Sequence, residues 1–206
     1  QALVCGVMEH IEEAGIHSGD SSCTIPPWSL SPDIVARIKS IARGLARELR
    51  VCGLMNVQMA VKDDQIYILE VNPRASRTAP FVSKAVHVPW PSIAAKVMMG
   101  RSLAELDAAE APDTGAFAVK ESVFPFTKFP GVDIVLGPEM RSTGEVMGID
   151  TTFGIAFAKG QISSGAGLPT SGAVFLSVRE SDRAAIVPVA RRLAEMGFDI
   201  YATAGT

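Results

Sequence analysis

The chain has 206 residues, of which 48% are apolar and 20% are charged, and its net charge is −3. This is an ordinary globular composition, long enough for one large or two small domains. The slight acidity gives no support for binding to nucleic acid or to an anionic membrane, and no uninterrupted apolar run approaches the length of a membrane span. The cysteines Cys5, Cys23 and Cys52 form no CxxC pair, which favours a reducing, cytoplasmic compartment. Both ends interrupt strand-like runs, so we expect a segment of a longer chain.

The first part of the chain predicts a strand, a polar loop and a helix. Apolar residues favour a strand over 2–11. Glycines and hydroxyls predict a loop over 16–22, which either lets backbone approach a ligand or is a plain surface turn. The run 31–33 (Ser-Pro-Asp) predicts a helix start, and apolar residues then recur at helical spacing up to Gly53, the expected stop.

A predicted β-hairpin follows and ends in a group of polar residues. Glu70, Asn72, Arg74 and Arg77 fall within eight residues, on and just past the second strand. Carboxylate and amide oxygens suit a hard divalent cation, and guanidinium groups suit phosphate oxygens. Together they suggest a metal–phosphate site and hence phosphoryl transfer.

The register of this hairpin decides whether the oxygen ligands meet. Strands over 54–62 and 66–72 are predicted from their Val, Ile and Tyr content. With a three-residue loop, Gln58 lies opposite Glu70 and Asn56 lies opposite Asn72, so all four share one face. A two-residue loop would separate Gln58 from Glu70, because a one-residue slip flips the face. The metal hypothesis therefore predicts the longer loop, while an ordinary hairpin with a polar outer face remains the alternative.

The remaining elements follow in chain order. We expect a short helix up to residue 85, a helix over 92–99 ended by Gly100, a surface excursion over 104–116, a strand over 117–124 and a helix over 152–161 interrupted by Gly154. The composition of 163–172 predicts a linker. A strand over 173–178, a helix over 181–196 and a strand over 198–201 then form a β-α-β unit, which favours a parallel sheet. Its second strand ends in Thr203-Ala204-Gly205-Thr206, where hydroxyls and a glycine suit a phosphate.

Three runs of residues resemble one known family along essentially the whole chain. They are Gly15-Ile16-His17-Ser18-Gly19-Asp20-Ser21, the run from Glu70 to Phe81 (EVNPRASRTAPF) and the run from Pro138 to Glu145 (PEMRSTGE). The chain resembles the large subunit of carbamoyl phosphate synthetase, in its second, carboxyl-terminal ATP-grasp half. The expected fold class is therefore α/β. Residues 1–162 would be the carboxyl-terminal ATP-grasp part, with an antiparallel sheet and helices. After the linker, 173–206 would begin a methylglyoxal-synthase-like regulatory domain with a parallel sheet.

The resemblance implies a reaction and its partners. A glutaminase small subunit supplies ammonia, one ATP-grasp half makes carbamate, and the second half phosphorylates carbamate with ATP to give carbamoyl phosphate for arginine and pyrimidine synthesis. The implied cofactors are ATP with Mg2+ or Mn2+, and K+ in addition. The parent enzyme is expected to be cytoplasmic, oligomeric and regulated by a nucleotide effector.

The resemblance also assigns roles residue by residue. The implied metal ligands are Gln58, Glu70 and Asn72, of which Gln58 and Glu70 also contact the nucleotide. The implied nucleotide loop is Gly15, Ile16, His17 and Ser18. The implied catalytic residues, which hold the transferred phosphate, are Arg74 and Arg77. The implied effector contacts are Thr203, Thr206 and Arg183, the last standing where the family often has a lysine.

Two other functions stay open at the level of sequence. The first is another ATP-grasp carboxylate ligase, such as a relative of biotin carboxylase. Such a protein shares the Glu-x-Asn-x-Arg ending but not the PEMRSTGE run. The second is a non-catalytic, effector-binding module. Because the upstream nucleotide-clamping groups of the family are missing, we expect the isolated chain to be inactive.

Overall fold

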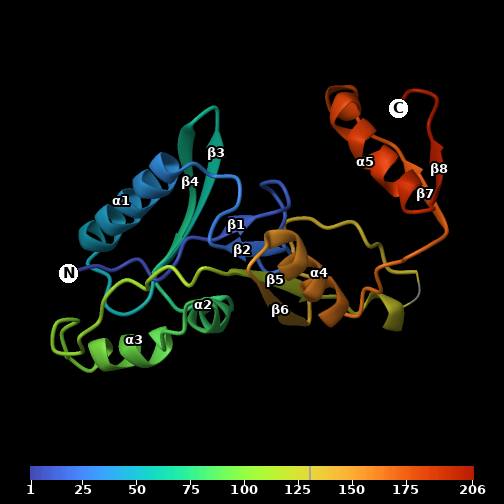
Figure 1. Cartoon of the computed structure of the whole chain (residues 1–206). Helices are drawn as coiled ribbons and strands as arrows, with labels where there is room; N and C mark the ends of the chain where they lie inside the picture. The colour runs from blue at the N-terminus through green and yellow to red at the C-terminus, as the bar shows by residue number, and fades with distance from the viewer. Residues whose placement is uncertain (130) are drawn as a thin grey trace. The chain divides into compact units, whose positions relative to one another are not determined.

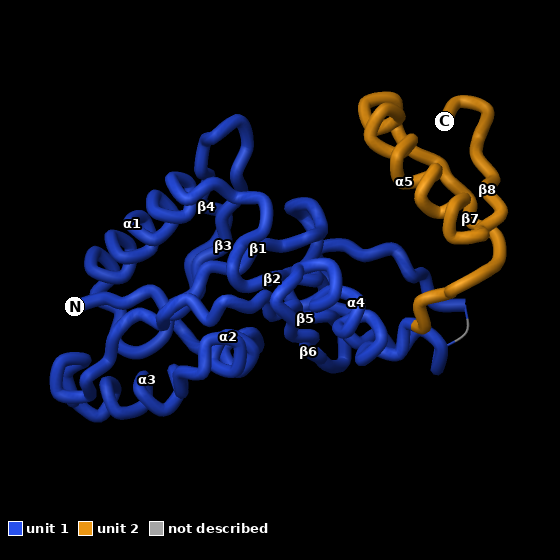
Figure 2. The backbone as a smooth tube through the Cα atoms, viewed as in Figure 1, with its two compact units in different colours: residues 1–166 blue, residues 167–206 orange. Residues whose placement is uncertain are grey.

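A computed structural model describes residues 1–129 and 131–206 of the chain. The chain divides into two compact units, Gln1–Ala166 and Gly167–Thr206 (Figure 2). The division falls within the segment predicted as a linker, whereas the assignment of the second unit to a regulatory domain stays a prediction. In the described part of the chain, no helix is long and apolar enough to cross a membrane.

A four-stranded antiparallel sheet with the order β1-β2-β5-β6 organises the first unit (Figure 1). Its strands are β1 (Glu9–His10), β2 (Cys23–Ile25), β5 (Phe117–Val123) and β6 (Gly144–Asp150). The prediction of β5 is confirmed, whereas β2 and β6 were not predicted. The strand expected over 2–11 is wrong for most of its length. Among the described residues only Glu9 and His10 of that run pair with another strand, and an extended run without ladder partners is not a strand.

Helix α4 (Phe153–Ser163) covers β5 and β6, as Figure 1 shows. It runs without a break, so the predicted interruption at Gly154 is wrong. Two glycines let it approach the sheet closely. A Cβ on Gly148 of β6 would clash with the Ala156 carbonyl of α4 and would lie 2.9 Å from Lys159 Cβ. Gly160 in turn faces Val119 of β5, where an added Cβ would lie 3.7 Å from Cγ1.

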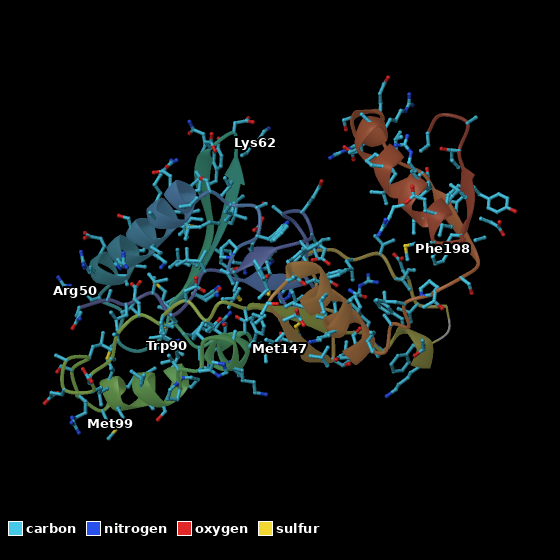
Figure 3. All side chains as sticks on the ribbon, viewed as in Figure 1. Arg50, Lys62, Trp90, Met99, Met147 and Phe198 are labelled. Carbon is cyan, nitrogen blue, oxygen red and sulfur yellow. The ribbon has the colours of Figure 1, made fainter. Side chains whose placement is uncertain are left out.

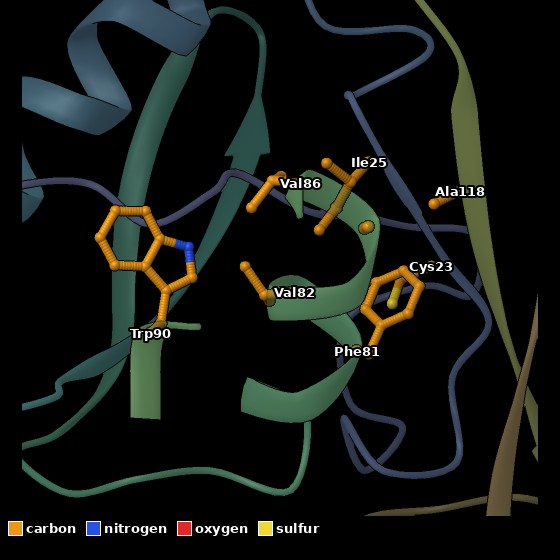
Figure 4. Packing of buried hydrophobic residues seen from close by; sticks show 8 residues of the cluster. Cys23, Ile25, Phe81, Val82, Val86, Trp90 and Ala118 are labelled. Carbon is orange, nitrogen blue, oxygen red and sulfur yellow. The ribbon is translucent and has the colours of Figure 1, made fainter. Parts of the chain in front are cut away.

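The hydrophobic core joins the sheet to two short helices, α2 (Ala79–Val86) and α3 (Trp90–Met98). Figure 4 shows Val82 and Val86 of α2 between the Trp90 ring and Ile25. Trp90 is 3% exposed and Phe81 is 6% exposed, so both aromatic rings are almost completely buried in the cluster. Both helices lie close to their predicted positions, and Gly100 follows α3 as expected.

Helix α1 (Pro32–Glu48) begins as the sequence predicts but ends earlier. The Ser31 hydroxyl accepts a hydrogen bond from Ile34 N at 3.3 Å, and Pro32 takes the first helical position. The helix ends at Glu48, five residues before Gly53, and Arg50 (labelled in Figure 3) adopts the left-handed region at φ 51°. The predicted stop at Gly53 is therefore wrong, and this glycine lies in the turn before the hairpin.

Segment 104–116 lies at the surface as predicted, with none of its residues buried, and Glu110 anchors it. The Glu110 carboxylate accepts a hydrogen bond from Val4 N at 3.1 Å and forms ion pairs with Arg43 and, at 3.5 Å, with Lys39 of α1. A single acidic residue thus connects α1, the N-terminal segment and the chain before β5.

The second unit is a β-α-β unit, as predicted. Strands β7 (Ala173–Leu176) and β8 (Asp199–Ala202) pair in parallel, and α5 (Arg183–Glu195) connects them. Two short 3-10 turns complete the described structure, Phe126–Lys128 in the first unit and Glu180–Asp182 in the second.

Candidate nucleotide and metal site

The hairpin of β3 (Asn56–Lys62) and β4 (Gln65–Asn72) turns in two residues. Lys62 at its tip, labelled in Figure 3, pairs with Gln65. Asp63 and Asp64 both adopt the left-handed region, at φ 50° and 58°. This is the backbone of the tight turn whose twist matches two antiparallel strands, and aspartate tolerates it. The predicted three-residue loop is therefore wrong.

A β-bulge nevertheless produces the predicted alignment of polar residues. Gln58 lies opposite Glu70 and Asn56 lies opposite Asn72, while the pairs nearer the tip follow the register of the two-residue loop. Leu69 is the extra residue that absorbs the difference. Because direct cross-strand partners point to the same side, the four polar side chains project from one face of the hairpin.

This face borders a cavity of about 1200 Å³. The cavity brings together all the residues predicted for the metal, the nucleotide loop and the phosphate. They are Gly15, Ile16, His17, Ser18, Gln58, Glu70, Asn72, Arg74 and Arg77. The loop 15–18 and the hairpin with its following turn, which are far apart in the sequence, therefore line one cavity.

Backbone hydrogen bonds hold the loop 15–18 in place. Gly15 has φ 112°, a conformation that favours glycine over residues with a side chain. His17 N donates to Gly137 O at 2.8 Å, and the His17 ring accepts from Gly19 N at 3.0 Å through Nδ1. The Ser18 hydroxyl accepts from Gln58 Nε2 at 3.3 Å, which connects the loop to the hairpin.

The two arginines lie where β4 leads into α2. A turn in which Arg74 N donates to Asn72 O at 2.8 Å redirects the chain after the strand. Both side chains are exposed, Arg74 bonding the Ala75 carbonyl and Arg77 contacting the Met140 thioether. In residues 1–129 and 131–206, neither guanidinium forms an ion pair with a carboxylate. Both keep their positive charge available to an anion in the cavity.

The oxygen donors on the hairpin face fit a hard divalent cation. Glu70 supplies a carboxylate, and Gln58 and Asn72 supply amide oxygens. The Gln58 amide nitrogen donates to Ser18, so its oxygen is the atom left for a cation. The described residues contain no group of three or more His, Cys, Asp or Glu that could hold a metal. A cation here would therefore rely on amide oxygens together with the phosphate oxygens of a ligand, as Mg2+ commonly does.

A buried polar network behind the loop was not predicted. Lys120 of β5 is fully buried, and its ammonium lies 3.3 Å from Ser18 O, 3.4 Å from Gly19 O and 3.8 Å from the Glu145 carboxylate. Buried lysines are almost always paired. A lysine in the middle of a predicted strand was therefore the sequence signal that could have indicated this network. Asp20 and Ser142, also buried, belong to the same network.

Two buried carboxylates of this network have opposite pKa shifts. Burial acts to raise the pKa of Asp20, but hydrogen bonds from Ser142 and Arg141 outweigh it and hold that pKa below its usual range. For Glu121, burial dominates and raises the pKa, although Ser22 Oγ donates to the carboxylate at 2.7 Å. The surroundings therefore favour the ionised form of Asp20 and disfavour the ionised form of Glu121.

The residues predicted to bind an effector lie together in the second unit. The hydroxyls of Thr203 and Thr206 are 2.6 Å apart, just after β8, and Thr206 N donates to Thr203 O at 2.9 Å. Thr206 also accepts from Val178 N, which follows β7. The Arg183 side chain lies beside the same turn. Its Nη2 would be 3.4 Å from a Cβ added to Gly205. The group occupies the carboxyl ends of two parallel strands, a common ligand position in open α/β sheets.

Comparison with known proteins places the chain in a family. The family model described as "Carbamoyl-phosphate synthase L chain, ATP binding domain" matches residues 1–106. The carbamoyl phosphate synthase large chain of Myxococcus xanthus is 57% identical over 99% of this chain, which covers 19% of the relative. That of Brucella suis is 56% identical over 100% of this chain and 18% of the relative. The chain thus spans about a fifth of the length of the curated relatives that it matches.

A solved structure shares the fold at much lower identity. A single-chain, multi-domain long-chain acyl-CoA carboxylase aligns with 68% of this chain and 18% of its own, at a TM-score of 0.53 and 16% identity. This similarity concerns the fold alone, and it agrees with the predicted class of mixed helices and antiparallel strands.

Proposed function

The chain belongs to the carbamoyl-phosphate synthase large-chain family, and on this basis we propose that it carries part of a site that phosphorylates carbamate with ATP. One observation supports the proposal most strongly. The hairpin face with Gln58, Glu70 and Asn72 borders the same cavity as Arg74 and Arg77. Oxygen donors for a cation and guanidinium groups for a phosphate thus face one space.

The reaction needs little covalent chemistry from the protein. A carbamate oxygen attacks the γ-phosphorus of ATP and forms the new P–O bond. The bond between that phosphorus and the β,γ-bridging oxygen breaks, and ADP leaves with the electron pair. Negative charge is spread over the equatorial oxygens of the transferred group. Arg74 and Arg77 act by positioning these oxygens and by stabilising their charge.

Gln58, Glu70 and Asn72 would hold Mg2+ or Mn2+, with K+ as a further cation of the parent enzyme. The divalent ion would neutralise phosphate charge during transfer. Ser18 orients the Gln58 amide through its hydrogen bond, and the loop 15–18 offers backbone groups to the nucleotide. The cation ligands and the nucleotide loop are thus connected before any ligand enters.

The rest of the enzyme follows from the family. We expect ammonia from a glutaminase small subunit, carbamate from the other ATP-grasp half, and carbamoyl phosphate for arginine and pyrimidine synthesis in the cytoplasm. The second unit would begin the regulatory domain of an oligomeric parent, with Thr203, Thr206 and Arg183 contacting a nucleotide effector. The isolated chain would be inactive, because it carries only part of the nucleotide site.

The two alternative functions are less well supported. The Myxococcus xanthus and Brucella suis relatives, which match 99% and 100% of this chain, are carbamoyl phosphate synthase large chains, and this argues against another carboxylate ligase. A non-catalytic module would leave Glu70 and Asn72 without a groove, whereas both border the cavity. We therefore favour the ligase.

Metal binding provides a test that does not depend on turnover. Electron paramagnetic resonance would follow the binding of Mn2+ to the full-length large chain in the presence of ADP. Because Glu70 is the only carboxylate of the proposed ligand set, Glu70→Gln should weaken Mn2+ binding about tenfold or more, the cost of one charged ligand. Glu48→Gln, at the exposed end of α1, is the matched control and should bind Mn2+ like the wild type. Equal affinity in both variants would exclude Glu70 as a ligand.

A further inference from the structure

Asp20 follows the loop 15–18 and connects it to segment 137–142, which is distant in the sequence. Its side chain is buried, with the residue 1% exposed. Oδ2 accepts a hydrogen bond from Arg141 N at 2.7 Å, and Oδ1 accepts one from Ser142 N at 2.9 Å. Both carboxylate oxygens are thus used by consecutive backbone N–H groups more than 120 residues away. This arrangement requires an ionised carboxylate with two acceptors, and the lowered pKa of Asp20 agrees with it.

Asp20 is itself tied to the loop 15–18 by short-range hydrogen bonds. The His17 carbonyl accepts from Asp20 N at 2.8 Å and from Ser21 N at 3.2 Å, which closes a tight turn. His17 N donates in the opposite direction, to Gly137 O at 2.8 Å. The loop is therefore attached to segment 137–142 on both sides of Ser18.

The Gly19 carbonyl provides a third attachment. It accepts hydrogen bonds from Ser122 Oγ at 2.8 Å, from Ser142 Oγ at 3.0 Å and from the Lys120 ammonium at 3.4 Å. Gly19 is also tightly surrounded, because a Cβ would lie 3.0 Å from Met140 Sδ and 3.1 Å from His17 Nδ1. The turn is thus held between β5 and segment 137–142.

Both sides of this junction reach the candidate site. Ser18 on the loop bonds Gln58 of the hairpin, and Met140 on segment 137–142 contacts Arg77. A shift of segment 137–142 relative to the loop would therefore move groups that border the cavity.

We propose that Asp20 is a positioning residue that fixes the loop 15–18 to segment 137–142 and thereby sets the affinity of the site for the nucleotide. The inference rests on the proposed function, because the loop is taken to contact ATP or ADP. Asp20 borders no part of the cavity, so it acts through the loop and not by contact with a ligand.

The test compares Asp20→Asn with wild type in the full-length large chain. Asparagine has nearly the same shape, but it replaces one acceptor by an NH2 group that faces a backbone N–H. We expect the KM for ADP in ATP formation from ADP and carbamoyl phosphate to rise about tenfold or more, as for a lost charged hydrogen bond. The kcat and the KM for carbamoyl phosphate should stay within about threefold. A purely structural role would instead lower kcat with the folded fraction and leave both KM values unchanged.

Two further variants complete the design. Asp107→Asn is the control, because Asp107 is exposed and has φ 49°, which asparagine tolerates. Ser142→Ala removes the hydroxyl, which bonds Gly19 O and also helps to lower the pKa of Asp20, and leaves the backbone N–H of residue 142 in place. It should raise the KM for ADP about two- to tenfold. An unchanged KM for ADP in a folded Asp20→Asn protein would overturn the inference. If Asp20→Asn does not fold, Ser142→Ala provides the test instead, and an unchanged KM for ADP in that variant would overturn the inference.

Calorimetric binding of ADP separates this inference from the proposed function. If the wild-type large chain binds ADP but makes no ATP from carbamoyl phosphate, the proposed function fails. The inference is then judged by the Kd for ADP, which Asp20→Asn should raise about tenfold. An equal Kd in the two proteins would overturn it.

Discussion

At the scale of single residues, the loop of the candidate site is held by buried charges that do not line the cavity. Lys120 sits beneath the carbonyls of Ser18 and Gly19 and neutralises their partial negative charge. Asp20 compensates the N–H groups of the neighbouring segment. Buried ionised groups are costly unless they are paired and hydrogen-bonded. Here backbone carbonyls accept hydrogen bonds from Lys120, and backbone N–H groups donate hydrogen bonds to Asp20. These bonds hold a loop that is rich in glycine and serine.

Glu121 gives a prediction about stability and pH. Because burial raises its pKa, the folded protein binds a proton on this carboxyl more readily than the unfolded chain. Its contribution to stability is therefore favourable below the unfolded pKa and is lost as the pH rises through the folded pKa. Glu121→Gln keeps an acceptor for Ser22 and removes the buried charge. We expect a higher melting temperature than wild type at pH 8, and little difference from wild type near pH 4, where a carboxyl of ordinary pKa is about half protonated.

Thermal unfolding followed by circular dichroism at the two pH values would measure this effect, with Glu48→Gln as an exposed control. The same change in melting temperature at pH 8 and pH 4 would show that Glu121 titrates as an ordinary carboxyl.

At the scale of elements, the hairpin shows which features could be predicted from the sequence and which could not. The opposition of Gln58 and Glu70 was predicted correctly, but from a three-residue loop that the protein does not have. Strand propensity and alternation carry no signal for a bulge. Leu69 and its neighbour Ile68 are both apolar and exposed, so either could have been the extra residue. The pairing followed from the hypothesis that Gln58, Glu70 and Asn72 bind one cation, whereas the bulge that produces it was not predicted.

Strand β6 was missed for a similar reason. It carries Gly144 and Gly148, and glycine is depleted in strands. The structure gives Gly148 a packing role, since α4 lies directly on its Cα. A glycine within a strand indicates a close approach of another backbone, but the sequence alone does not name the approaching element.

This close packing leads to a prediction about the sheet and its helix. Gly148→Ala should destabilise the protein by about 1–3 kcal/mol, because the methyl group forces α4 away from β6. Gly154→Ala is the matched control, as Gly154 lies in α4 with nothing near its Cβ position. It should stabilise the protein by about 0.4–1 kcal/mol by reducing the freedom of the unfolded chain. Urea unfolding of both variants would measure the two effects, and similar stabilities would contradict the packing role of Gly148.

At the scale of the whole molecule, the sequence predicted the class and the order of most elements. The mixed α/β class with an antiparallel sheet is confirmed, as is the parallel β-α-β unit at the end. The buried network of Asp20, Lys120 and Ser142 could not be predicted. Asp20 precedes Lys120 and Ser142 by 100 residues or more, and only the fold brings their hydrogen-bonding groups together. Local patterns predict elements, whereas long-range polar contacts depend on how the elements pack.

We propose that this site transfers a phosphoryl group between carbamoyl phosphate and ADP. The most direct measurement is the formation of ATP from ADP and carbamoyl phosphate with Mg2+ in the full-length large chain, comparing wild type, Glu70→Ala and Glu48→Ala. We expect the wild type and Glu48→Ala to be active. Glu70→Ala should lose about two orders of magnitude or more in rate with an unchanged circular dichroism spectrum, as for the loss of a strong electrostatic contact to the transferred group. Retained activity in Glu70→Ala would show that the hairpin is structural and would contradict the assignment of Gln58, Glu70 and Asn72.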